Sequence, residues 1–95
     1  MSSYLIEIPH SEDKIECMNA IKLFLDSGSH FLANADWGCS DGEHKAWLVV
    51  DVENKDQAVQ IVPPLYRSKA KIVELVKYTW DDMKEGMEYH TDQGH

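Results

Sequence analysis

The sequence predicts a single α+β domain in which four strands alternate with two helices, followed by one further helix. Its 95 residues, 43% hydrophobic and 27% charged, suit one folded domain and are too few for two cores. Apolar residues also recur with a period of two in some segments and with helical spacing in others. We therefore treat residues 1–95 as one domain, with a core spanning about residues 4–79.

The first strand is expected over Tyr4 to Ile8, a β-rich run that Pro9 ends because proline has no N–H to donate. A helix is expected over about residues 12–27. Ser11 is its predicted N-cap, acidic residues follow in the first turn, and Gly28 supplies a left-handed stop. The apolar residues at helical spacing are Cys17, Met18, Ile21, Phe24 and Leu25.

The segment from His30 to Val52 is expected to form a β-hairpin with a tight turn at Asp41-Gly42. In its first half, apolar residues alternate with a mixed set, which indicates a strand over residues 30–37. The second half alternates in the same way, so Trp37 and Trp47 are expected on opposite faces of the sheet. The mixed set of the first half is His30, Leu32, Asn34 and Asp36.

A short helix is expected to begin at Asn54, which with Gln57 resembles a capping pair, and to end at Pro63-Pro64. Lys71 to Thr79 is sufficiently β-branched and apolar for a fourth strand. Thr79 and Asp82 then resemble the capping box of a final helix, over about residues 80–90. Beyond this helix we expect a frayed tail.

This β-α-β-β-α-β order is the ferredoxin-like arrangement, a four-stranded antiparallel sheet with helices on one face. The open face is expected to carry Leu32, Trp47 and Val49. A face with these side chains is too apolar to be left wholly exposed to water, so a second subunit should cover it. We also expect the first and third strands to run parallel. That orientation would place His10 at the end of the sheet where His30 lies.

Charge and composition disfavour some classes of partner and compartment. The chain has 17 acidic and 9 basic residues, a formal charge of −8, which disfavours nucleic acid. No apolar run approaches the roughly 18 residues that span a bilayer, so we expect no membrane segment. Because no secretory signal is visible, we expect a cytoplasmic protein. Two cysteines are too few for a disulfide scaffold, so both are expected to be reduced thiols.

Chemically reactive side chains are concentrated at the predicted turn. A tight turn at Asp41-Gly42 would place Cys39 opposite His44, close enough to share a metal ion such as zinc, nickel or copper. Asp41, or Asp36, would then supply an oxygen ligand. The pair could instead be a thiol that the imidazole activates, with a pKa below the free thiol value of about 8.5. It could equally be a polar turn with a buried thiol.

The remaining candidates concern a small organic ligand. Trp47, Asn34 and Leu32 could line a cavity in which His30 or His44 moves a proton, as in an isomerase or a cofactor-independent monooxygenase. Arg67 could hold an anionic ligand, or it could form an ion pair. The sequence thus predicts a homodimer that binds a small ligand or a transition metal, with a small enzyme as the alternative.

The pattern His30, Trp37-Gly38-Cys39, Gly42 and His44, followed by Val62-Pro63-Pro64 and Arg67, resembles a group of functionally uncharacterised small bacterial proteins. These belong to the dimeric α/β-barrel superfamily, and the resemblance covers roughly residues 30–79. It implies a ferredoxin-like subunit whose sheet pairs with that of a second copy. The superfamily also contains haem-degrading monooxygenases, muconolactone isomerases and metal-binding proteins, so the resemblance implies architecture rather than one activity.

Overall fold

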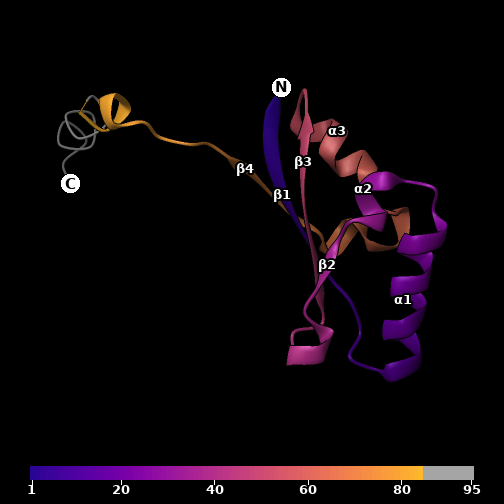
Figure 1. The fold of residues 1–95 in the computed structure, drawn as a ribbon. Coiled ribbons are helices and arrows are strands. Elements are labelled where there is room, and N and C mark those ends of the chain that lie inside the picture. The colour runs from indigo at the N-terminus through magenta and orange to yellow at the C-terminus, as the bar shows by residue number, and fades with distance from the viewer. Residues whose placement is uncertain (85–95) are drawn as a thin grey trace.

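The computed structural model describes residues 1–84 and shows an α+β fold built on a four-stranded antiparallel sheet of order β2-β3-β1-β4. Helices α1, α2 and α3 lie on one face of this sheet (Figure 1). The element order and the strand order agree with the predicted ferredoxin-like arrangement. The elements are β1 Ser2–Pro9, α1 Lys14–Asp26, α2 His30–Ala33, β2 Asp36–Trp37, β3 Lys45–Val52, α3 Lys55–Ile61 and β4 Lys71–Leu75, with 3₁₀ helices at Cys39–Asp41 and Pro64–Lys69.

The core lies between the sheet and the helices. Strand β1 is central, and its alternate residues Tyr4, Ile6 and Ile8 are all buried on the helix-covered face. Phe24 of α1 packs on them and also meets the Trp37 ring at a centroid distance of 4.9 Å. Burying each such side chain contributes about 1.5–3 kcal/mol to folding. The core therefore joins β1, α1 and the start of the hairpin, which are the elements that carry the site described below.

Helix α1 starts later than expected. Asp13, not Ser11, is its N-cap, because the Asp13 carboxylate accepts the Glu16 N–H at 3.1 Å. The stop at Gly28 is confirmed, with φ at 81°. The buried face consists of Cys17, Ala20 and Phe24, whereas Met18 and Leu25, which the sequence placed in the core, are exposed. One residue is a 100° rotation on a helix, so Met18 and Leu25, each one residue beyond the buried Cys17 and Phe24, point away from the core.

The strand predicted over residues 30–37 is wrong for most of its length. Residues His30–Ala33 form the short helix α2, and β2 contains Asp36 and Trp37 alone. Ser29 caps α2 by accepting the Leu32 N–H, and the Asn34 side chain donates to the His30 carbonyl oxygen at 2.7 Å. These local hydrogen bonds compete with a strand ladder. As a result Leu32 is buried in the core and does not lie on the open face.

Strands β1 and β3 run antiparallel, which contradicts the expected parallel orientation. Pro9 pairs with Lys45, and the His10 N–H donates to the His44 carbonyl oxygen at 3.0 Å. The reason is topological: the crossover through α1 makes β2 parallel to β1, and the hairpin then reverses the chain, so β3 must oppose both. His10 therefore lies at the hairpin end, beside His44.

The C-terminal elements follow the prediction in part. Asn54 caps α3 by accepting the Gln57 N–H at 2.9 Å, as expected. Strand β4 ends at Leu75, earlier than expected, and the chain then extends away from the domain (Figure 1). The Thr79–Asp82 capping box is present, with bonds of 2.9 and 3.1 Å in the two directions, and residues 80–84 are helical. The rest of the predicted helix lies outside the described residues.

Among the helices of residues 1–84, none combines the length and the apolar character needed to cross a membrane.

Candidate metal centre

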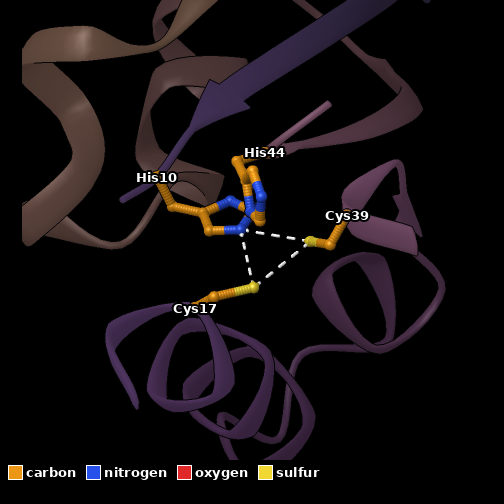
Figure 2. Close-up of side chains that lie close together, drawn as sticks. All are labelled: His10, Cys17, Cys39 and His44. Carbon is orange, nitrogen blue, oxygen red and sulfur yellow. Dashed lines mark hydrogen bonds between the residues drawn. The ribbon is translucent and has the colours of Figure 1, made fainter. Parts of the chain in front are cut away.

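Four potential metal ligands converge at one end of the sheet: His10, Cys17, Cys39 and His44. One ligand atom from each lies within 4.8 Å of the others (Figure 2). The Nε2 atom of His10 is 3.2 Å from both sulfur atoms, which are 3.4 Å from each other. The two histidines and Cys39 are half-buried, and Cys17 is buried. The arrangement is therefore a partly enclosed Cys₂His₂ cluster.

Each ligand is placed by a different part of the fold. His10 directly follows β1, which ends at Pro9, and His44 directly precedes β3. Because β1 and β3 pair side by side, their ends bring the two imidazoles to a centroid distance of 5.5 Å. Cys17 projects from the first turn of α1 on its buried face, and Cys39 begins the 3₁₀ helix of the hairpin loop. Local sequence distance could not have revealed this convergence.

The hairpin loop differs from the predicted two-residue turn. Residues 38–44 connect β2 to β3, and they contain the 3₁₀ helix followed by Gly42 in the left-handed region, with φ at 85°. Gly38 closes the loop by donating to the Lys45 carbonyl oxygen at 3.1 Å and accepting the Glu43 N–H at 3.0 Å. The wider loop still brings Cys39 to His44, because the 3₁₀ turn folds the thiol back over the strand ends.

Gly38 is the tightest position in this loop. A Cβ atom there would lie 2.7 Å from the Trp47 ring and 2.8 Å from the Glu43 carbonyl oxygen. We expect Gly38→Ala to destabilise the domain by about 1–3 kcal/mol, the usual range for overpacking, because a backbone oxygen cannot move aside as a flexible side chain can. Urea unfolding followed by circular dichroism measures the change. Ser40→Ala, on the same loop but exposed, is the control, and equal midpoints for the two variants would contradict the expectation.

Burial disfavours the charged forms of His10 and Cys39 when no ion is bound. Burial lowers the pKa of His10, and His44 lowers it further, so this imidazole stays neutral and able to coordinate. Burial raises the pKa of the Cys39 thiol, and Cys17 adds to that effect. The expected low-pKa, activated thiol is therefore wrong for the metal-free site. A bound dication would reverse this balance, because two thiolates and two neutral imidazoles neutralise its charge.

Two polar atoms of the cluster have no partner in the part of the chain that the structure describes. The Nδ1 atoms of His10 and His44 are both buried without a hydrogen bond. Leaving a buried polar atom unsatisfied costs about 1–3 kcal/mol, so such atoms normally mark a missing ion or water. The Nε2 atom of His10 faces the sulfur atoms, so its unpaired Nδ1 atom lies on another side of the ring and would need a partner of its own beside any bound ion.

The spacing fits tetrahedral coordination. With zinc–sulfur bonds of about 2.3 Å and zinc–nitrogen bonds of about 2.05 Å, a regular tetrahedron has sulfur atoms about 3.8 Å apart and sulfur–nitrogen distances of about 3.6 Å. The corresponding distances here are 3.4 and 3.2 Å. Moving His10, Cys17 and Cys39 outward by a few tenths of an ångström would match these values, with a His44 ligand atom, within 4.8 Å of the other three, as the fourth ligand.

Sequence reasoning identified half of this cluster. Cys39 and His44 were expected together and lie together, while Asp41 is exposed and is not among the four grouped residues. His10 and Cys17 were missed. The signal for His10 was its position directly after the central strand, which points to the hairpin end once the strands are taken as antiparallel. Cys17 could have been found from its place on the buried face of α1.

The other candidate residues lie apart from the cluster. His30 and Asn34 are exposed and border a shallow groove that also contains Asp36 and Val49, and Trp47 does not line it. Trp47 lies on the open face of the sheet and Trp37 lies on the other face, as expected. The Trp47 indole N–H donates to the Glu7 carboxylate at 3.0 Å.

Arg67 has a contact that the sequence did not suggest. Its guanidinium donates to the backbone carbonyl oxygens of Val62 and Gln60, at 2.8 and 3.2 Å. Those carbonyls lie at the C-terminal end of α3, where helices leave such groups unpaired. In this structure Arg67 therefore caps a helix, and neither an anionic ligand nor an ion pair is needed to explain its position.

No protein-family model, curated protein or solved structure matches this chain. The resemblance to the dimeric α/β-barrel superfamily accordingly stays a prediction.

Proposed function

We propose that this protein binds one transition metal ion per chain, zinc before nickel or copper, at the cluster of His10, Cys17, Cys39 and His44. The observation that carries the proposal is the convergence of four ligand atoms within 4.8 Å from four separate parts of the fold. Two thiolates with two imidazoles form one of the usual ligand sets of structural zinc. Nickel(II) and copper(II) favour square-planar or tetragonal sites, which this near-tetrahedral spacing does not resemble.

The ligand count bears on what the ion does. Catalytic zinc sites keep one position open for water or substrate, whereas sites with four protein ligands are closed and structural. Here the ion would join the end of β1, the first turn of α1 and the hairpin loop. This arrangement favours a metal-stabilised binding protein over the isomerase or monooxygenase alternative.

Metal content and affinity test the proposal directly. We expect the purified protein, stripped with a chelator and titrated with zinc, to bind one ion per chain, measured by calorimetry and by elemental analysis after desalting. Cobalt substitution should give the visible absorption of a tetrahedral site with thiolate ligands. His30→Ala, which alters an exposed histidine outside the cluster, is the matched control and should bind as the natural chain does. Binding that is unchanged in His10→Ala would contradict the proposed ligand set.

We further propose that the protein is a homodimer paired through the open face of its sheet, as in a dimeric α/β barrel. Leu5 pairs with Val49 on one side and with Val73 on the other, which makes a continuous apolar row across three strands. Val49 is 61% exposed and Val73 is 38% exposed. A second copy of the same row would cover these side chains and remove them from water.

The segment after β4 supports the same partner. Val76 and Tyr78 alternate with polar residues on the stretch that leads away from its own domain (Figure 1), and Trp80 begins the helix that follows; all three side chains are exposed. Alternation with a period of two gives such a stretch one apolar side. An open groove of about 540 Å³ lies where the face meets β4, bordered by Val49 and Leu75. The segment after β4 of one copy would lie against the sheet of its partner.

Trp47 provides the test of the dimer. It occupies the open face next to Val49, so we expect Trp47→Ala to weaken dimerisation by about 2 kcal/mol, roughly 30-fold in Kd, the size of an interface hot spot. Sedimentation at several concentrations measures the Kd, and urea unfolding shows separately whether the subunit has lost stability. Met18→Ala changes an exposed side chain of α1 and serves as the control. A natural chain that sediments as a monomer at micromolar concentration would refute the dimer.

A further inference from the structure

The two cysteines of the cluster are close enough to react with each other. Their Sγ atoms are 3.4 Å apart, although 22 residues separate them in the chain, and both are free thiols. A disulfide bond is about 2.0 Å long, so the sulfurs must approach by about 1.4 Å. Cys39 lies at the start of a 3₁₀ turn in a loop, where a change in its side-chain rotamer and a small loop shift supply that movement.

The environments of the two thiols differ, which assigns their roles. Cys39 is half-buried and can meet a small oxidant from solvent, whereas Cys17 is buried, with 7% exposure. In such a pair the accessible sulfur is oxidised first, to a sulfenic acid. The enclosed sulfur beside it then reacts with that sulfenic acid to form the disulfide. His10 Nε2 lies 3.2 Å from both sulfur atoms, so the two thiols and this imidazole form one compact group.

From these positions we infer that the site is an oxidation-sensitive metal switch, in which a hydroperoxide joins Cys17 to Cys39 and thereby releases the metal ion. The inference rests on the proposed metal-binding function and adds a regulation to it. Metal retention would then depend on the redox state of the surroundings.

The chemistry balances with a hydroperoxide, ROOH, as the oxidant. The Cys39 thiolate attacks the terminal oxygen, the O–O bond breaks, the departing alkoxide takes a proton from solvent and leaves as ROH, and Cys39 becomes a sulfenic acid. The Cys17 thiolate then attacks that sulfur, the S–O bond breaks, and the departing hydroxide takes a second proton from solvent and leaves as water. Overall two thiolates lose two electrons to form the disulfide, and ROOH with two protons becomes ROH and water. A thiol such as dithiothreitol reverses the change by exchange.

The consequence for the ion follows from the ligand count. A disulfide sulfur carries no charge and is a poor ligand, so oxidation removes both anionic ligands together. Only the imidazoles of His10 and His44 then remain, and two neutral ligands do not hold zinc at low concentration. Release of the ion and formation of the bond are thus coupled events.

The experiment treats the zinc-loaded, full-length chain with hydrogen peroxide. Zinc content is measured first, and a chromogenic chelator then records zinc release while thiols are counted. Trypsin cleaves after Lys14, Lys22 and Lys45, which places Cys17 in the peptide 15–22 and Cys39 in the peptide 23–45. We expect one zinc released for every two thiols lost, and a linked pair of these peptides that is two hydrogen atoms lighter than their sum. Dithiothreitol should restore zinc binding.

Four outcomes decide the inference. The linked peptides, appearing at the rate of zinc release, support it. Retention of zinc after the peptides have become linked overturns it, as does release accompanied by sulfinic acid or by a link between two chains. In both of these cases the proposed metal binding stands. A chain that holds no zinc before oxidant overturns the metal proposal and this inference together, and the zinc measurement made first identifies that case.

Two variants control for folding. Cys17→Ser alters a buried position, so its circular dichroism spectrum must match that of the natural chain before its result is used. Cys39→Ser alters a half-buried loop position and leaves the helix intact. Neither variant can form the bond within a chain, so peroxide should yield no linked 15–22 and 23–45 peptides in either.

Discussion

Removing the metal ion is expected to lower the unfolding midpoint of the domain by about 15 °C or more. An ion present at 1,000 times its Kd stabilises the folded state by about 4 kcal/mol, and each kcal/mol shifts the midpoint of a domain of this size by about 4–8 °C. The effect is large because the ion would connect β1, α1 and the hairpin loop. A domain of 95 residues also buries only a small apolar core, so each further link contributes much of its stability. Calorimetry with zinc and with a chelator measures the shift.

The variant Cys39→Ser should reproduce this loss without a chelator. Structural zinc sites bind with about 10–16 kcal/mol shared among four ligands, so losing one thiolate should cost about 3 kcal/mol, more than 100-fold in affinity. Ser40→Ala is the matched control, because it alters the next residue of the same turn, which is exposed and outside the cluster. Identical midpoints for the natural chain in zinc and in chelator would rule out a stabilising ion.

Phe24→Ala is expected to cost about 3–5 kcal/mol, the range for truncating a buried phenylalanine, and thus much of the total stability of a small domain. Phe24 is 1% exposed and lies between two aromatic neighbours, with Trp37 at 4.9 Å and Tyr66 at 6.0 Å between ring centroids. Its loss would leave a cavity that these large rings cannot collapse to fill. Unfolding in urea, monitored by tryptophan fluorescence, measures the change.

The same variant should also weaken metal binding. Trp37 rests on Phe24, meets the His10 ring at 5.4 Å, and directly precedes the Gly38-Cys39 segment, so disorder at Trp37 is transmitted to two of the four ligands. Leu25→Ala is the control: its side chain is 59% exposed, and its removal should change stability by less than about 0.5 kcal/mol. Equal costs for the two variants would show that the core does not depend on Phe24.

Local patterns determined much of the fold. The alternation of β3, the end of β1 at Pro9, the Asn54 cap of α3 and the capping box at Thr79 each depend on neighbouring residues, and each is present as expected. The element order, and with it the ferredoxin-like sheet, follows from these segments. The two caps are readable in one sequence because their hydrogen bonds join residues three apart, and the strand signals are readable because alternation and proline involve neighbouring residues.

The sequence did not determine the structure of segments for which two local conformations compete. Residues 30–33 alternate like a strand, yet the Ser29 cap and the Asn34 side chain complete a helical turn instead. The sequence also left open which face of α1 is buried, since Cys17 and Met18 are neighbours and both are apolar. Only packing against the sheet selected the face with Cys17, Ala20 and Phe24.

The candidate metal centre likewise has one half that is local in the sequence and one half that is not. Cys39 and His44 are five residues apart, so a hairpin loop of almost any form brings them together, and the sequence alone determined that half of the cluster. His10 and Cys17 arrive through the antiparallel pairing of β1 with β3 and the docking of α1, contacts between residues far apart in the chain. Tertiary structure alone decided this second half, because strand orientation and helix facing are set by burial of the whole core rather than by any local spacing.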